Sequence, residues 1–179
     1  MDNTHEGQGA TDAAADDSTA AIGGWWCNQQ PTEKMDVWWF SYRVLPGDHP
    51  WAFKKASPQR EIAALELFGL SYLMKAVHKN GVIRRGQHTL RMTMDNKGEV
   101  FVGNKWSARS WSSAAIMADL GIHCMAAGLH PVLQHKHREL NTWADDLLKE
   151  ALAGFDPKKR LLPVATSGWA LLQNLIAFP

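Results

Sequence analysis

The stretch "HTLRMTMDNKG" covers residues 88–98, and it shows how this chain alternates between strand and turn. Apolar and polar side chains alternate over residues 88–94, a period of two that predicts a strand with one buried face. The strand ends at Asp95, and the Asn-Lys-Gly sequence that follows predicts a turn. We expect residues 99–103, "EVFVG", to continue the strand briefly after that turn.

The segments on either side supply the other elements of the fold. Residues 57–81 are the best predicted helix, with Ser57 as its N-cap and Pro58 at its first position. The remaining predicted elements are a hairpin of strands over 21–27 and 35–45, a first strand around Asp12, a helix over 107–128, a strand over 129–136, a helix over 141–155 and a short amphipathic helix over 166–178. This order predicts an α/β fold with a mixed sheet and helices packed on it.

The composition is that of a single globular domain. The 179 residues carry a formal net charge of +1, so any nucleic-acid binding must come from a local basic patch. Cys27 and Cys124 lack metal-ligand spacing and are expected to be free thiols. No apolar run is long enough to span a membrane, and the polar start lacks the apolar core of a signal peptide. We therefore expect an intracellular protein of the cytoplasm or nucleus, with no membrane partner and with residues 1–10 disordered.

Four acidic residues occupy positions where a carboxylate could serve chemistry. Glu66 shares the apolar stripe of its helix, Asp95 ends a strand, Asp145 lies near the start of a late helix, and Asp12 precedes a Gly-Trp strand. Each also has an ordinary explanation. Glu66 could lie at the edge of the apolar face and reach water, Asp95 could begin a turn, Asp145 could stabilise the start of its helix, and Asp12 could belong to an acidic terminus. Together they form the ordered carboxylate pattern that a two-metal phosphoryl-transfer site requires, with two Mg²⁺ ions about 4 Å apart. Asp146 is expected either to face solvent or to lie behind the metal ligands without binding the metal itself.

Four blocks of the sequence resemble a known family. The blocks "TDAA…IGGWW", "IAALEL", "MTMDNKG" and "RELNTWADDL" look like the motifs of the ribonuclease H-like domain at the end of retroelement reverse-transcriptase polyproteins. The resemblance covers residues 11–155 and leaves 156–179 as a tail. It implies a five-stranded mixed sheet whose first three strands are antiparallel, flanked by helices.

The resemblance also implies an activity and its residues. It implies Mg²⁺-dependent hydrolysis of the RNA strand of an RNA–DNA hybrid, with Mn²⁺ as a possible substitute and a reverse-transcriptase module as a possible partner. The catalytic and metal-binding set would be Asp12, Glu66, Asp95 and Asp145. Candidate nucleic-acid contacts are Asn96, Lys97, Lys105, Arg109, Lys136 and Arg138, and candidate auxiliary residues are His135, His137 and Asn141.

The sequence departs from the family pattern at three places. The segment "HEGQGAT" before Asp12 has almost no apolar residues, so either the first strand is short or the chain is an amino-truncated copy. Ala14 replaces a serine, and "HKHREL" (135–140) replaces a glycine-containing loop. The weak first strand favours a second hypothesis, a catalytically silent module that binds nucleic acid or tethers a polymerase. A third hypothesis is a transposase, integrase or resolvase of the same fold, and a fourth is an α/β domain with four unrelated acids.

Overall fold

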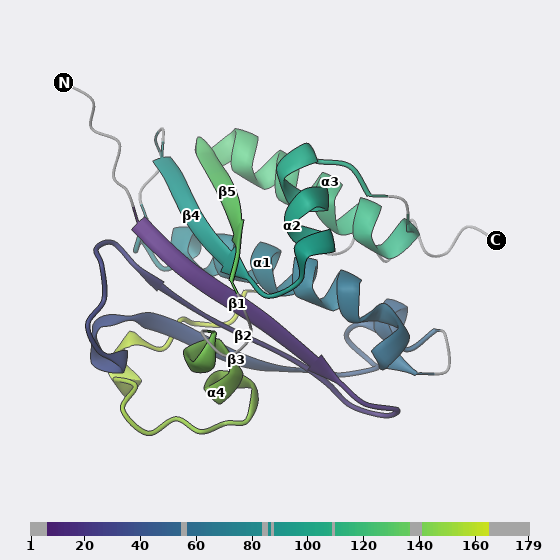
Figure 1. The fold of residues 1–179 in the computed structure, drawn as a ribbon, viewed down its shortest axis with the longest axis horizontal. Helices are drawn as coiled ribbons and strands as arrows, with labels where there is room; N and C mark the ends of the chain where they lie inside the picture. Colours follow the sequence, from purple (N-terminus) through teal and green to yellow (C-terminus); the bar gives the residue numbers. More distant parts are fainter. Residues whose placement is uncertain are drawn as a thin grey trace.

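The computed structural model describes residues 7–54, 57–83, 86, 88–108, 110–136 and 141–164. Its centre is a five-stranded mixed sheet in the order β3-β2-β1-β4-β5 (Figure 1). The strands are β1 (Gly7–Ala15), β2 (Ala20–Cys27), β3 (Trp38–Val44), β4 (His88–Met94) and β5 (Leu129–His135). Strands β1, β2 and β3 pair antiparallel, whereas β4 runs parallel to both β1 and β5. The predicted fold class is confirmed.

Helices cover both faces of this sheet. The helices are α1 (Ile62–Lys79), α2 (Lys97–Lys105), α3 (Trp111–Ala127) and α4 (Thr142–Leu148). Side chains of α1, α2 and α3 pack into the larger apolar core on one face. A smaller core on the other face joins Ala144 and Leu147 of α4 to Ala10 and Trp25, and Figure 1 shows α4 apart from the other helices. No helix in the described ranges is both long and apolar enough to cross a membrane.

Strand β1 begins at Gly7, so the expectation of a disordered segment over residues 1–10 is wrong for residues 7–10. Residues 1–6 lie outside the described part. The strand looks weak in the sequence because its apolar surface comes from a neighbour: a Cβ on Gly7 would lie only 1.9 Å from the Trp26 ring. Small residues are therefore required where the Trp26 indole crosses β1. Because these residues are small, the sequence of β1 lacks the alternation of apolar and polar residues that predicts a strand.

Residues 97–105 form α2, so the predicted turn after Asp95 and the predicted strand over 99–103 are both wrong. Asn96 is the N-cap, and its Oδ1 accepts hydrogen bonds from the backbone N–H groups of Gly98 at 2.9 Å and Glu99 at 3.4 Å. Asparagine favours turns and N-caps for the same reason, because its side chain bonds to nearby backbone N–H groups. The short "EVFVG" run thus fits a strand or a helix equally well.

Helix α4 ends at Leu148, well before the predicted end at 155. The chain turns at Glu150, whose backbone φ is +55°, and then packs Phe155 into the smaller core. Helix α3 likewise starts at Trp111, later than the predicted 107. The helix predicted over 166–178 lies outside the described residues. Cys27 and Cys124 are free, as predicted.

Replacing Gly9 by alanine should destabilise the sheet. The added Cβ would lie 2.5 Å from the backbone oxygen of Trp25, a contact that no side-chain rotation relieves. We expect the free energy of unfolding to fall by about 1–3 kcal/mol in a urea titration. Gly47→Ala is the control, since nothing lies within 4 Å of a Cβ there. Equal stability of the two variants would contradict this packing.

Candidate active site

Glu66 is a carboxylate held inside the protein. It sits in the third turn of the segment that starts at Pro58, between the buried residues Leu65 and Leu67, and is only 7% exposed. Its Oε2 atom has no hydrogen-bond partner among the described residues. The pKa of Glu66 is raised to about 8, mainly by burial and also by the negative charges of Asp95, Asp12 and Glu99, while a hydrogen bond from Asn96 lowers it. A carboxyl group in such a place is a common mark of a functional site.

Asp12 and Asp95 reach this region from two parallel strands. The ladder between β1 and β4 pairs Ala10 with Thr93. Two residues further along the chain come Asp12, within β1, and Asp95, just after β4. Asp12 is 3% exposed, and its Oδ1 accepts a hydrogen bond from the N–H of Ala13 at 2.8 Å. Asp95 is half-buried just beyond the carboxyl end of β4. Such strand ends are where open α/β sheets bind ligands.

Asp145 is placed differently from these three acids. Its carboxylate pairs with Lys149, one turn along α4, at 2.5 Å, and its charge is not among those that raise the pKa of Glu66. The neighbouring Asp146 pairs with Lys34 at 2.7 Å with its side chain 31% exposed, so it faces solvent only in part. The structure thus brings three of the four predicted acids together and leaves Asp145 in an ion pair.

Asn141 nevertheless ties the start of α4 to β1. It is 3% exposed, and its side-chain Nδ2 donates a hydrogen bond to the carbonyl oxygen of Thr11 at 3.2 Å. Asn141 is the N-cap residue of α4, although its side chain makes no capping hydrogen bond to that helix. Because Thr11 precedes Asp12, this bond sets where α4 begins relative to the acids.

Loss of the Asn141 side chain should loosen this connection. We expect Asn141→Ala to lower the free energy of unfolding by about 1–2 kcal/mol, since a buried acceptor loses its donor. Thr142→Ala, at the exposed next position, should change it by no more than about 0.5 kcal/mol. Urea titration of both variants measures the difference. If Asn141→Ala left the free energy of unfolding unchanged, the hydrogen bond from Asn141 to Thr11 would not hold α4 in place.

Glu99 is an acid of this region that the sequence does not predict. It occupies the third position of α2, is 8% exposed, and has a buried Oε2 with no hydrogen-bond partner among the described residues. Burial raises its pKa. One feature of the sequence could have indicated the helix that carries Glu99. An asparagine followed three residues later by a glutamate, as in Asn96 and Glu99, is typical of the start of a helix. That pattern gives no reason to expect the carboxylate to be buried beside Glu66.

The donor set fits a hard divalent cation. In the described ranges, no three His, Cys, Asp or Glu side chains lie close enough to hold one ion as they stand. Mg²⁺ commonly uses only one or two carboxylates, with water completing its shell. The oxygen atoms without partners on Glu66 and Glu99, together with the charges of Asp12 and Asp95, supply donors of that kind.

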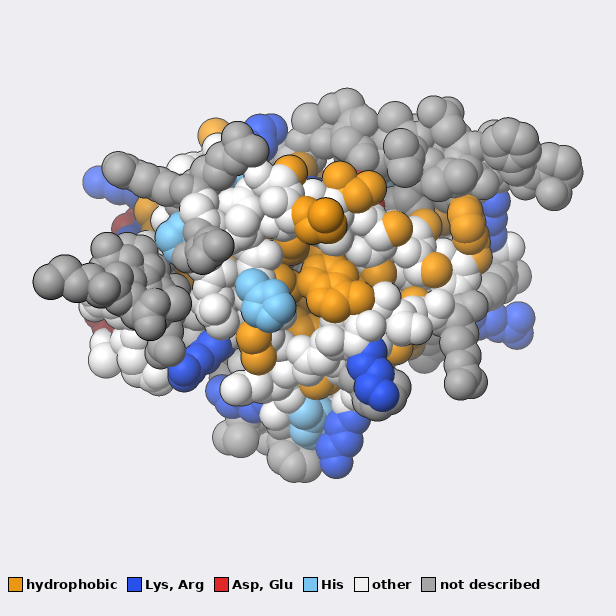
Figure 2. All heavy atoms as spheres, turned by 90° about the horizontal axis from the view of Figure 1, so that it is seen from above, with side chains coloured by type: hydrophobic (Ala, Val, Ile, Leu, Met, Phe, Trp, Pro, Cys, Tyr) orange, Lys and Arg blue, Asp and Glu red, His pale blue; other side chains and the backbone are white. Residues whose placement is uncertain are grey.

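Some of the residues predicted to contact nucleic acid lie near these acids. Lys97 and Lys105 are exposed at the two ends of α2. The backbone N–H of Lys136 donates to the carbonyl oxygen of Met94 at 2.9 Å, which places Lys136 beside Asp95, and half-buried His135 precedes it. Asn96 serves as the cap of α2, while Arg109, His137 and Arg138 lie outside the described residues. Figure 2 shows one face where Lys and Arg side chains surround an apolar centre.

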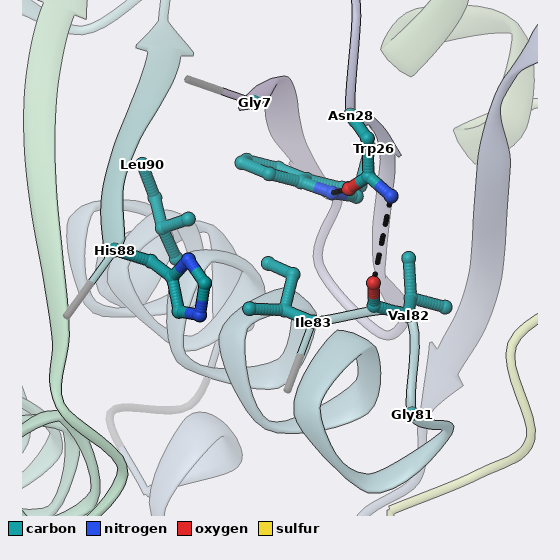
Figure 3. A pocket seen from close by; sticks show the side chains of 8 residues that line it. All are labelled: Gly7, Trp26, Asn28, Gly81, Val82, Ile83, His88 and Leu90. Carbon is teal, nitrogen blue, oxygen red and sulfur yellow. Dashed lines mark hydrogen bonds between the residues drawn. The ribbon is translucent and has the colours of Figure 1, made fainter. Parts of the chain in front are cut away.

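A second hollow lies at the other end of β1 and β4. It is lined by Gly7, Trp26, Asn28, Gly81, Val82, Ile83, His88 and Leu90 (Figure 3). The Asn28 amide there donates to the carbonyl oxygen of Val82 at 3.5 Å. None of these lining residues is acidic, so this hollow is separate from the carboxylate site.

Known structures share this architecture. LC11-RNase H1, a ribonuclease H1 isolated from compost, was solved in complex with an RNA/DNA hybrid. That structure matches with a TM-score of 0.53 at 14% identity, over 82% of this chain and 99% of its own. The ribonuclease H1 of the halophilic archaeon Halobacterium salinarum matches with a TM-score of 0.50 at 13% identity, over 82% and 97%. This chain has the ribonuclease H fold. No family model and no curated protein match its sequence.

Proposed function

We propose that this protein is a metal-dependent endonuclease that hydrolyses the RNA strand of RNA–DNA hybrids. The observation that carries the proposal is the meeting of acids from three separate elements of a ribonuclease H fold. The negative charges of Asp12 in β1 and Asp95 after β4 act on Glu66 of α1, and Glu66 keeps a buried Oε2 without a hydrogen-bond partner among the described residues. Burying such acids is costly unless they serve a cation or a proton.

The cofactor in this proposal is Mg²⁺, as two ions, with Mn²⁺ as a substitute. When bound, such ions activate water and neutralise charge on the leaving oxygen. Asp12 and Asp95 would hold them from the two strands, and Glu66 from α1. The hydrogen bond between Asn96 and Glu66 would fix the orientation of that carboxylate. Lys97, Lys105 and Lys136 would contact backbone phosphates, and the 2′-hydroxyls would distinguish RNA from DNA.

Asp145 would complete the set once it leaves Lys149. The ion pair involves a Lys149 side chain that is 67% exposed, so the pair is weak and easily exchanged. His135 and His137 would assist release of product or metal. We assign the chain to a retroelement-derived setting, with a reverse-transcriptase module as partner, on its four motif blocks alone.

A cleavage panel tests the proposal. End-labelled RNA–DNA hybrid, duplex RNA and duplex DNA of one sequence are incubated with the protein and Mg²⁺, with EDTA as the control. The expected result is internal cleavage of the RNA strand of the hybrid only. Cleavage of duplex DNA instead would support a transposase- or resolvase-type nuclease, and intact hybrid would contradict nuclease function.

The pairing of Asp145 with Lys149 favours a second candidate, a silent module that binds hybrids without cutting them. Such a module would retard a labelled hybrid in a gel while leaving its RNA strand intact. The same panel therefore separates the two candidates.

A further inference from the structure

We propose that Glu99 is a fifth acid of the site and that Glu66 and Glu99 together hold a divalent cation on the α2 side. This inference rests on the proposed function, because it assumes that the acid cluster binds cations. It adds a residue that the four motif blocks do not contain.

The first observation is that two carboxyl groups are buried with oxygen atoms that have no hydrogen-bond partner among the described residues. Glu66 and Glu99 are 7% and 8% exposed, and each has a buried Oε2 without a hydrogen-bond partner among the described residues. Within the described ranges, no Lys, Arg or His side chain forms an ion pair with either carboxylate. A protein interior rarely leaves two such oxygens unsatisfied.

The second observation is that the two side chains come from elements that pack together. Ala63 of α1 and Glu99 of α2 line one hollow, and Ala63 lies three residues before Glu66 on the same side of the helix. The charge of Glu99 also acts on Glu66. Asn96, the N-cap of α2, hydrogen-bonds the Glu66 carboxylate and also accepts from the backbone N–H of Glu99. Glu66 therefore lies beside the first turn of α2, which carries Glu99.

A divalent cation would stabilise this arrangement. Two neighbouring carboxyl groups in a low-dielectric interior ionise with difficulty, and a divalent ion bound between them stabilises both ionised forms at once. Two carboxylates with water suffice for Mg²⁺, so a third protein ligand is not required. The same hollow is lined by Lys105, Ser107, Ser110 and Ser113, so it is polar enough for such water.

The test measures cation binding and stability rather than catalysis. Mn²⁺ is titrated calorimetrically into wild type, Glu99→Gln and Asp95→Asn, with Glu150→Gln as a matched control that removes an exposed charge. We expect Glu99→Gln to lower the Mn²⁺ affinity at least about tenfold or to remove one bound ion, and Glu150→Gln to bind as wild type. In EDTA, Glu99→Gln should melt no lower than wild type, because it replaces a buried carboxyl group whose Oε2 has no hydrogen-bond partner among the described residues. The same measurement shows that the variant folds.

The results distinguish a failure of the role of Glu99 from a failure of the proposed function. If Asp95→Asn loses Mn²⁺ while Glu99→Gln binds it as wild type does, the role of Glu99 is overturned and the proposed function stands. If wild type binds no Mn²⁺, both are overturned. A Glu99→Gln protein that melts lower in EDTA also contradicts the inference, since it would show that Glu99 stabilises the fold without a cation.

Discussion

Asp95→Asn is expected to abolish cleavage of the RNA strand of a hybrid, with a rate loss of about a thousandfold or more. The substitution keeps the shape of the side chain and removes the negative charge at the carboxyl end of β4. In the proposed mechanism that charge holds a cation beside Asp12 and Glu66, so its loss affects the chemical step itself. Single-turnover cleavage of an end-labelled hybrid measures the effect.

A matched control separates charge loss at the site from charge loss elsewhere. Asp146→Asn removes a half-buried aspartate that pairs with Lys34 on the far face of the sheet. Its cleavage rate should stay within about threefold of wild type, because a partly exposed ion pair contributes little. Cleavage by Asp95→Asn at the wild-type rate would show that Asp95 is not in the active site.

The second large effect is on stability as a function of pH in the absence of divalent cations. The pKa of Glu66 is raised from 4.5 to about 8 in the folded protein. Between these two values the unfolded chain gives up this proton while the folded protein keeps it. Stability from this group is therefore complete below about pH 4.5 and is lost as pH rises through about 8, by roughly 2–4 kcal/mol.

Glu66→Gln isolates this contribution. The variant lacks the ionisable group, so its stability should fall less than that of wild type between about pH 5 and pH 9. Urea titrations in EDTA at both pH values measure the difference between the two proteins. Parallel pH profiles would show that Glu66 ionises as freely in the folded protein as in the unfolded chain.

The sequence predicts those elements whose own residues carry the pattern. Helix α1 and strand β4 are predicted because their apolar residues recur at the spacing of the element, and the β2–β3 hairpin because its aromatic residues mark strands. Strand β1 is underestimated because Gly7 and Gly9 make room for Trp26, so its apolar surface is contributed by another strand. That information is tertiary and cannot be read from residues 7–15 alone.

The sequence likewise indicates only some of the residues of the candidate site. The sequence predicts Asp12, Glu66 and Asp95 as site candidates from their order along the chain. The parallel pairing of β1 with β4 places Asp12 and Asp95 at the same end of the sheet, and their charges act on Glu66 of α1. Glu99 is missed because the sequence predicts a turn and a strand where the helix that carries it lies. The pairing of Asp145 with Lys149 depends on side-chain positions that helical spacing allows but does not fix.

The central claim is that these acids form one cation site, and the melting temperature with and without Mg²⁺ tests it most directly. Addition of about 10 mM Mg²⁺ to EDTA-treated protein should raise the melting temperature by roughly 4–8 °C, because a cation with Kd near 0.1–1 mM stabilises only the folded state. The rise should vanish in Asp95→Asn. A wild-type melting temperature that does not respond to Mg²⁺ would contradict the account.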